Sequence, residues 1–130
     1  MTRRGVLSLD REQPSNDLWE AALKVVIMWK DFGSPPATRA EAVRMMRQEY
    51  DAADEGERQV TLDVVTVAHS VAVASVPQHV RRRFKLIRSA TSSDIDHAAV
   101  ADDVERAARG VPPAARSALI DWVIYWHWER

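Results

Sequence analysis

The chain has 130 residues, of which 46% are hydrophobic and 28% are charged, which is the composition of a globular domain able to bury one core. Its formal net charge of -1 provides no general attraction to nucleic acid or anionic lipid, so such binding would need a local patch. The lack of cysteine excludes disulfides, thiolate metal sites and cysteine nucleophiles.

The N-terminal residues 1–16 are predicted to form a loosely held arm, followed by a single helical domain over 17–130. The arm has no apolar run of signal-peptide length before Asp10, so we expect a cytoplasmic protein that does not enter a membrane. A first helix is predicted over 17–32 and ends at Gly33, before two prolines. Its expected inner face consists of Leu18, Ala22, Val25, Val26 and Trp29.

The second helix is predicted over 39–53, because Thr38 and Glu41 have the spacing of a capping box. Residues 51–57 contain four acidic residues and Gly56, so they are predicted to form a solvated turn. A third helix is predicted over 57–75, since this apolar stretch is too long for an ordinary strand. The expected solvent face is Asp63, Thr66 and Ser70, and the expected buried face is Val60, Val64, Val67, Ala68 and Val71.

Three further helices are expected in the second half of the chain. Pro77 suits the first turn of a helix over 77–90, and a capping signal at Ser93–Asp96 predicts a helix that ends at Gly110. The last helix, 112–130, is apolar on most sides and leaves only Ser117, Asp121 and Tyr125 for solvent. The fold class is therefore predicted as all-α, a compact bundle of five to six helices with a Trp-rich C-terminal core helix. The apolar circumference of that helix also makes a homodimer a reasonable expectation.

The segment 71–88 resembles a helix-turn-helix, in which a second helix with a basic face enters the major groove of DNA. The residues expected to bind nucleic acid are Arg81, Arg82, Lys85 and Arg88 on phosphates, with Gln78 and His79 near the bases. The simpler interpretation is a solvated basic face that pairs with the acidic segments 49–57 and 94–105.

Catalytic and cofactor motifs are not found. The four histidines lack the spacing of a metal-binding helix, so a metal site would require convergence in space that the sequence does not show. No nucleophile elbow, Walker lysine or glycine-rich phosphate loop occurs either. We therefore expect no enzyme, no cofactor and no metal.

Two functional hypotheses follow. The leading one is a small non-enzymatic regulator that binds nucleic acid through the basic helix at 78–90. The alternative is a protein-interaction module, such as an inhibitor or adaptor. It would use Trp126 and Trp128 of the Trp-rich C-terminus, or the arginine patch against an acidic protein partner.

Overall fold

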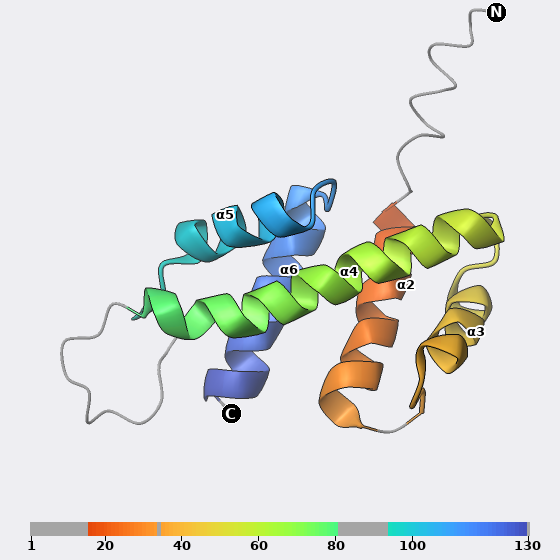
Figure 1. The fold of residues 1–130 in the computed structure, drawn as a ribbon, viewed down its shortest axis with the longest axis horizontal. Coiled ribbons are helices and arrows are strands. Elements are labelled where there is room, and N and C mark those ends of the chain that lie inside the picture. Colours follow the sequence, from red (N-terminus) through yellow and green to blue (C-terminus); the bar gives the residue numbers. More distant parts are fainter. Residues whose placement is uncertain (1–15, 34, 81–93, 130) are drawn as a thin grey trace, which may run out of the picture. The chain divides into compact units, whose positions relative to one another are not determined.

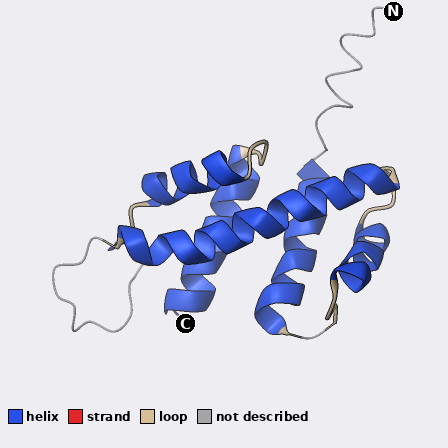
Figure 2. Cartoon of the chain, viewed as in Figure 1, coloured by secondary structure: helices blue, strands red, loops and turns tan. Residues whose placement is uncertain are grey.

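In a computed structural model of the protein, the described residues are 16–33, 35–80 and 94–129, and they form helices joined by loops (Figures 1 and 2). The elements are α2 (Asn16–Ile27), the π-helical turn η1 (Met28–Phe32), α3 (Arg39–Glu49), α4 (Glu55–Ser75), the 3-10 helix η2 (Val76–His79), α5 (His97–Ala107), α6 (Pro113–Ile124) and the π-helical turn η4 (Tyr125–Glu129). The all-α prediction is confirmed, with five α-helices in the described part.

The chain divides into two compact units, Met1–Asp63 and Val64–Arg130, and the division falls inside α4. The expected organisation as an arm followed by a single domain stays a prediction.

In the first unit, α2 packs against α3 through the inner face that the sequence predicted. Leu18, Ala22, Val25 and Val26 are fully buried there, with Ala42 and Met46 of α3. The Lys24 ammonium lies 3.1 Å from Glu49 and joins the two helices at their surface. Trp29 is only half-buried and carries the Lys30 ammonium 4.0 Å from its ring centroid, so it is not the core residue expected.

The capping box of α3 is confirmed. The Glu41 N–H donates to Thr38 Oγ1 at 3.2 Å, and the Glu41 carboxylate accepts from the Ala37 N–H at 2.6 Å. The helix ends at Glu49, four residues earlier than predicted, because Tyr50 is extended. The expected solvated turn at 51–57 is partly wrong, since Asp54 accepts from the Glu57 N–H at 2.8 Å and α4 has already begun at Glu55.

The helical state of α4 was predicted correctly, but the face that it buries was predicted only in part, with Ala68 buried and Asp63 and Ser70 exposed as expected. Val60 is 63% exposed and Val67 is 45% exposed, and both lie on the same side as exposed Asp63 and Ser70. The buried positions are Arg58, Thr61, Leu62, Val65, Ala68, His69, Ala72 and Ser75. Polar side chains on this face are buried because they have hydrogen-bond partners, such as the Thr61 hydroxyl, which donates to the Glu57 carbonyl at 2.8 Å. Hydropathy alone therefore did not identify the buried face.

The helix Glu55–His79 is long enough to cross a membrane, and its most apolar 18-residue stretch has a mean hydropathy of 1.5 and is 44% buried inside the protein. Core helices of soluble proteins have the same length and hydropathy, so this feature is weak evidence for a membrane.

The prediction that a helix begins at Pro77 is wrong for its first residues. Residues 76–79 form the 3-10 helix η2, and Val80 is extended and makes an isolated antiparallel bridge with Ile95. The bridge is supported by the Asp96 N–H, which donates to the His79 carbonyl at 2.9 Å. The remainder of that predicted helix, 81–90, lies outside the described residues.

In the second unit, α5 packs against both α6 and η2 (Figure 1). It starts at His97, three residues later than the capping signal suggested, because its N-cap is Asp96, which accepts from the Ala99 N–H at 3.1 Å. The core of α6 consists of Leu119, Ile120, Val123 and Ile124. The predicted solvent strip Ser117, Asp121 and Tyr125 is exposed as expected, whereas Trp122, Trp126 and Trp128 are half-buried.

Candidate interaction surface

Three aromatic side chains lie together along α6 and η4. The Trp122 and Trp126 rings are stacked, with centroids 5.2 Å apart and an interplanar angle of 15°. The Tyr125 ring lies 5.9 Å from Trp122 at an angle of 51°. We call Trp122, Tyr125 and Trp126 the aromatic surface.

The helical repeat places these residues on one face. Positions i, i+3 and i+4 are neighbours on a helix, and Ile120 and Ile124, buried on the opposite side of α6, hold that side in the core. Tyr125 is 50% exposed and both tryptophans are partly exposed, so part of the aromatic surface is accessible to solvent. Asp121, whose side chain is 69% exposed, lies one turn before Tyr125 and 3.9 Å from His97 on α5.

A second apolar surface lies in the first unit, on the side of α2 away from its core. Leu23, Ile27, Met28 and Phe32 line a groove of about 540 Å³, and Glu20 and Lys24 border it. Phe32 is 49% exposed there. We call this feature the α2 groove.

A polar cluster joins α4 and η2 to α5. The Ser75 hydroxyl donates to Asp103 Oδ2 at 2.7 Å, and His79 Nε2 lies 3.0 Å from the same oxygen. An ionised carboxylate only accepts hydrogen bonds, so the histidine nitrogen donates as well. Arg106 pairs with the other carboxylate oxygen. The hydrogen bond from Ser75 and then that from His79 lower the pKa of Asp103 below its ordinary value.

The same residue types form catalytic triads, but this arrangement is different. In a triad, histidine lies between serine and the carboxylate and takes the proton of the serine. Here the carboxylate lies between the other two groups, and Ser75 is only 4% exposed. The cluster therefore connects helices and has no activated nucleophile.

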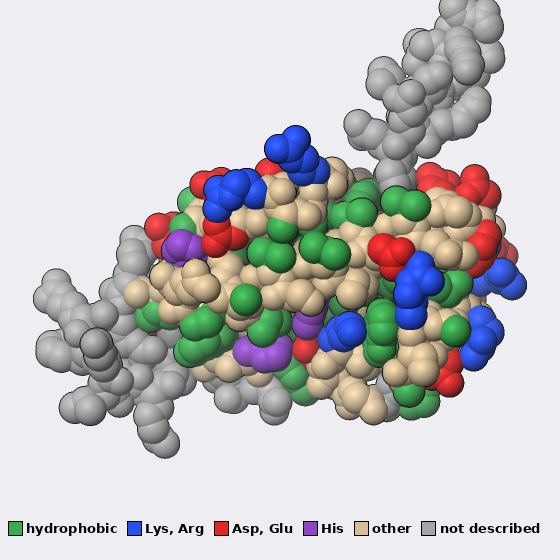
Figure 3. All heavy atoms as spheres, in the orientation of Figure 1, with side chains coloured by type: hydrophobic (Ala, Val, Ile, Leu, Met, Phe, Trp, Pro, Cys, Tyr) green, Lys and Arg blue, Asp and Glu red, His purple; other side chains and the backbone are tan. Residues whose placement is uncertain are grey.

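Many basic side chains in the described part pair with acids of the same unit. In the first unit, Glu55 binds Arg58 at 2.7 Å and Arg47 at 2.9 Å, and these bonds lower its pKa to about 2. Arg39 binds Asp63 through two hydrogen bonds of 2.7 and 2.9 Å. In the second unit, Arg116 lies 2.7 Å from Glu105. Figure 3 shows acidic and basic side chains side by side over α5.

The predicted site residues are placed as follows. Gln78 is exposed in η2, and His79 is half-buried against Asp103. Trp126 belongs to the aromatic surface, and Trp128 is half-buried in η4. The basic residues Arg81, Arg82, Lys85 and Arg88 lie outside the described residues.

Sequence reasoning missed part of each feature. Trp122 was assigned to the core and Tyr125 to a solvent strip, although their spacing with Trp126 indicates one face. The i, i+4 spacings of Leu23 with Ile27 and of Met28 with Phe32 could likewise have indicated the α2 groove. The polar cluster had no comparable signal, because Asp103 is 28 residues from Ser75 and 24 from His79.

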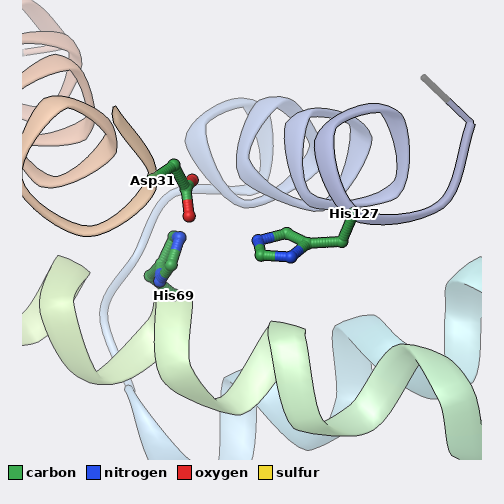
Figure 4. A group of neighbouring side chains, drawn as sticks. All are labelled: Asp31, His69 and His127. Carbon is green, nitrogen blue, oxygen red and sulfur yellow. The ribbon is translucent and has the colours of Figure 1, made fainter. Parts of the chain in front are cut away.

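Two histidines of the second unit, which could act as ligands of a transition metal, come from different helices. His69 of α4 and His127 of η4 have ring centroids 6.3 Å apart (Figure 4).

Comparisons with known proteins do not assign the chain to a family, because no family model, no curated protein and no solved structure matches it.

Proposed function

We propose that this chain is a non-enzymatic protein-interaction module that binds a protein partner on the aromatic surface. The observation that carries the proposal is the partly exposed group of Trp122, Tyr125 and Trp126 on one helical face. Tryptophan and tyrosine dominate the energetic centres of protein interfaces, because they bury a large area at a low cost in conformational entropy.

The arrangement of the polar groups supports a non-enzymatic role. Ser75 and His79 both bond to Asp103 and form no nucleophile–base pair with each other. A module of this kind acts by binding, so its partner is recognised by surface shape and by aromatic contact.

The test compares two lysine substitutions at aromatic residues of nearly equal exposure. Tyr125→Lys alters the aromatic surface, and Phe32→Lys alters the α2 groove, where the native residues are 50% and 49% exposed. Proteins that bind the tagged wild-type chain are identified, and their affinities for both variants are measured at rising salt. The proposal expects Tyr125→Lys to weaken binding at least about tenfold, as for an interface hot spot, with little effect of salt.

Two results would contradict this assignment. Binding that is lost only in Phe32→Lys would move the interface to the α2 groove, and binding unaffected by either variant would reject both surfaces. The mass of the chain in solution, measured by light scattering, separates a second copy from a different protein as the partner.

Nucleic-acid binding is the second candidate, and one observation favours it. Some of the carboxylates that were expected to neutralise the basic segment pair with other basic residues: Glu49 with Lys24, Glu55 with Arg47 and Arg58, and Glu105 with Arg116. The segment 81–93 contains five basic residues and no acidic ones. No acidic residue within the segment itself offsets this charge.

Salt dependence distinguishes the two candidates. Phosphate binding weakens steeply as ionic strength rises, whereas an aromatic interface responds little. The nucleic-acid hypothesis expects a labelled duplex to bind the wild-type chain at low salt and to be lost in the double variant Arg81→Ala/Lys85→Ala. Retention of duplex binding in that variant would reject it.

A further inference from the structure

His69 and His127 come together from elements that are far apart in the sequence. His69 belongs to α4 and is 5% exposed, whereas His127 belongs to η4 and is exposed. Their rings are inclined at 63° in a T-shaped contact, and Figure 4 shows the His127 imidazole extending toward that of His69. Both residues belong to the second unit.

We propose that His69 and His127 bind a divalent transition-metal ion of the zinc class. Neutral imidazole nitrogen is a preferred ligand of Zn²⁺, Cu²⁺ and Ni²⁺, and histidine is the commonest metal ligand in proteins. Mg²⁺ and Ca²⁺ prefer oxygen ligands, so they should bind poorly here. The two histidines therefore select the chemical class of the ion.

The distances are close to those that one ion requires. Zn–N bonds are about 2.0–2.1 Å long, so two nitrogens on one tetrahedral ion are about 3.4 Å apart. Ligand nitrogens of His69 and His127 lie within 4.8 Å of one another. The remaining difference is about 1.4 Å at most, and a rotation of the exposed His127 side chain can provide it.

The ion would connect the last turn of the chain to α4. Two protein ligands leave the other coordination positions to water, so this site should be weaker than a structural zinc site with four ligands. Its effect is on stability: an ion that binds only the folded chain stabilises it according to its concentration. The ring contact between His69 and His127 would then be exchanged for two metal–nitrogen bonds.

The experiment is a titration of the full chain with ZnCl₂ and, as a control, MgCl₂. Calorimetry at pH 7.5 should give one Zn²⁺ per chain, and the melting temperature should rise by about 5 °C at saturation. Mg²⁺ should have no such effect. Binding should weaken at acidic pH, because protons compete for the imidazole nitrogens.

The matched variants are His127→Ala and His97→Ala, since both remove a solvent-accessible imidazole from the second unit. Removal of a group that merely orients a ligand costs about 10–100-fold in metal affinity, so loss of the ligand His127 should cost no less. His97→Ala should bind Zn²⁺ as the wild type does. Because His127 is exposed, its variant should fold without the metal, which circular dichroism checks.

A spectroscopic signature locates the ion. Trp126 and Trp128 flank His127, so Cu²⁺ bound there should quench tryptophan emission in the wild type and in His97→Ala, but not in His127→Ala. Equal Zn²⁺ affinity in His127→Ala and the wild type, or an equal shift with Mg²⁺, would overturn the proposal. A chain that binds no Zn²⁺ at all would overturn it as well.

Discussion

The Asp103 carboxylate accepts hydrogen bonds from Ser75 and His79 only when the chain is folded, so its pKa is lower in the folded state. A group with a lowered folded pKa contributes stability above its unfolded pKa and loses that contribution as pH falls through the folded value. The ordinary value is 3.8, so the loss belongs below about pH 4. Asp103 should therefore make the fold sensitive to acid.

The variant Asp103→Asn tests this dependence. It should be less stable than the wild type at pH 7, and the difference should shrink as the pH falls below about 4, because the wild-type carboxyl also becomes neutral there. Denaturant unfolding at several pH values measures it. Asp102→Asn is the control, since Asp102 is exposed and adjacent in the sequence. A difference that stays constant with pH would show that the ionised form has no special role.

The buried Ser75 provides a second test of the same polar cluster. Removing its hydroxyl deletes one hydrogen bond to a carboxylate that retains other partners, so Ser75→Ala should cost about 1–2 kcal/mol of unfolding free energy. Ser70→Ala, at an exposed position of the same helix, should change stability by less than about 0.5 kcal/mol. Equal losses in the two variants would mean that helix propensity, and not the Asp103 bond, sets the effect.

Two glycines at helix ends provide a second test, because replacing each of them by alanine should change the stability of the chain in opposite directions. Gly33 follows η1 with φ of +69°, a conformation that costs other residues about 1–2 kcal/mol, and nothing lies within 4 Å of an added Cβ. Gly33→Ala should therefore destabilise the chain through its backbone alone. Gly56 lies in the first turn of α4, where an added Cβ would meet Asp54 Oδ1 at an ordinary 3.5 Å.

Gly56→Ala should accordingly stabilise the chain by about 0.4–1 kcal/mol, by reducing the freedom of the unfolded chain and improving helix propensity. Thermal unfolding of both variants measures the difference in sign. A Gly33→Ala variant as stable as the wild type would show that the turn at residue 33 adjusts without strain.

Local signals in the sequence predicted the elements well, and long-range contacts decided what they missed. The capping box at Thr38 and the length of the apolar run in α4 act within one helix, so both predictions were confirmed. The buried face of α4 depends on partners elsewhere, such as Asp103 for Ser75, whereas the pattern of apolar residues had placed Val60 and Val67 on it. The pairing of Val80 with Ile95, which interrupts the helix expected at Pro77, is equally nonlocal.

The sequence indicated only one residue of the aromatic surface, for the same reason. Trp126 was chosen because tryptophan is common at interfaces, and it lies in the partly exposed aromatic surface, while its role in binding stays a prediction. Trp122 and Tyr125 could be assigned only by knowing which side of α6 is buried, and the buried Ile120 and Ile124 lie on the side opposite to them. Helical periodicity does not determine it when nearly every position is apolar.

The division of the chain inside α4 gives this helix a role in both units. Residues up to Asp63 belong to the first unit and those from Val64 to the second, yet α4 is continuous from Glu55 to Ser75. A defect in the middle of α4 should therefore lower the stability of both units. Val67 suits the test, because it is 45% exposed and its replacement removes little packing.

Val67→Pro removes a backbone hydrogen bond and clashes with the carbonyl of Asp63, which costs about 3 kcal/mol or more in a helix interior. Val67→Ala is the control and should be neutral or slightly stabilising, since alanine is the better helix former. Amide hydrogen exchange in α2 and α6 reports on the two units separately. We expect protection to fall in both helices of Val67→Pro and in neither helix of Val67→Ala. Protection retained in α2 but lost in α6 would mean that the first unit folds with its own end of α4 and does not depend on the rest.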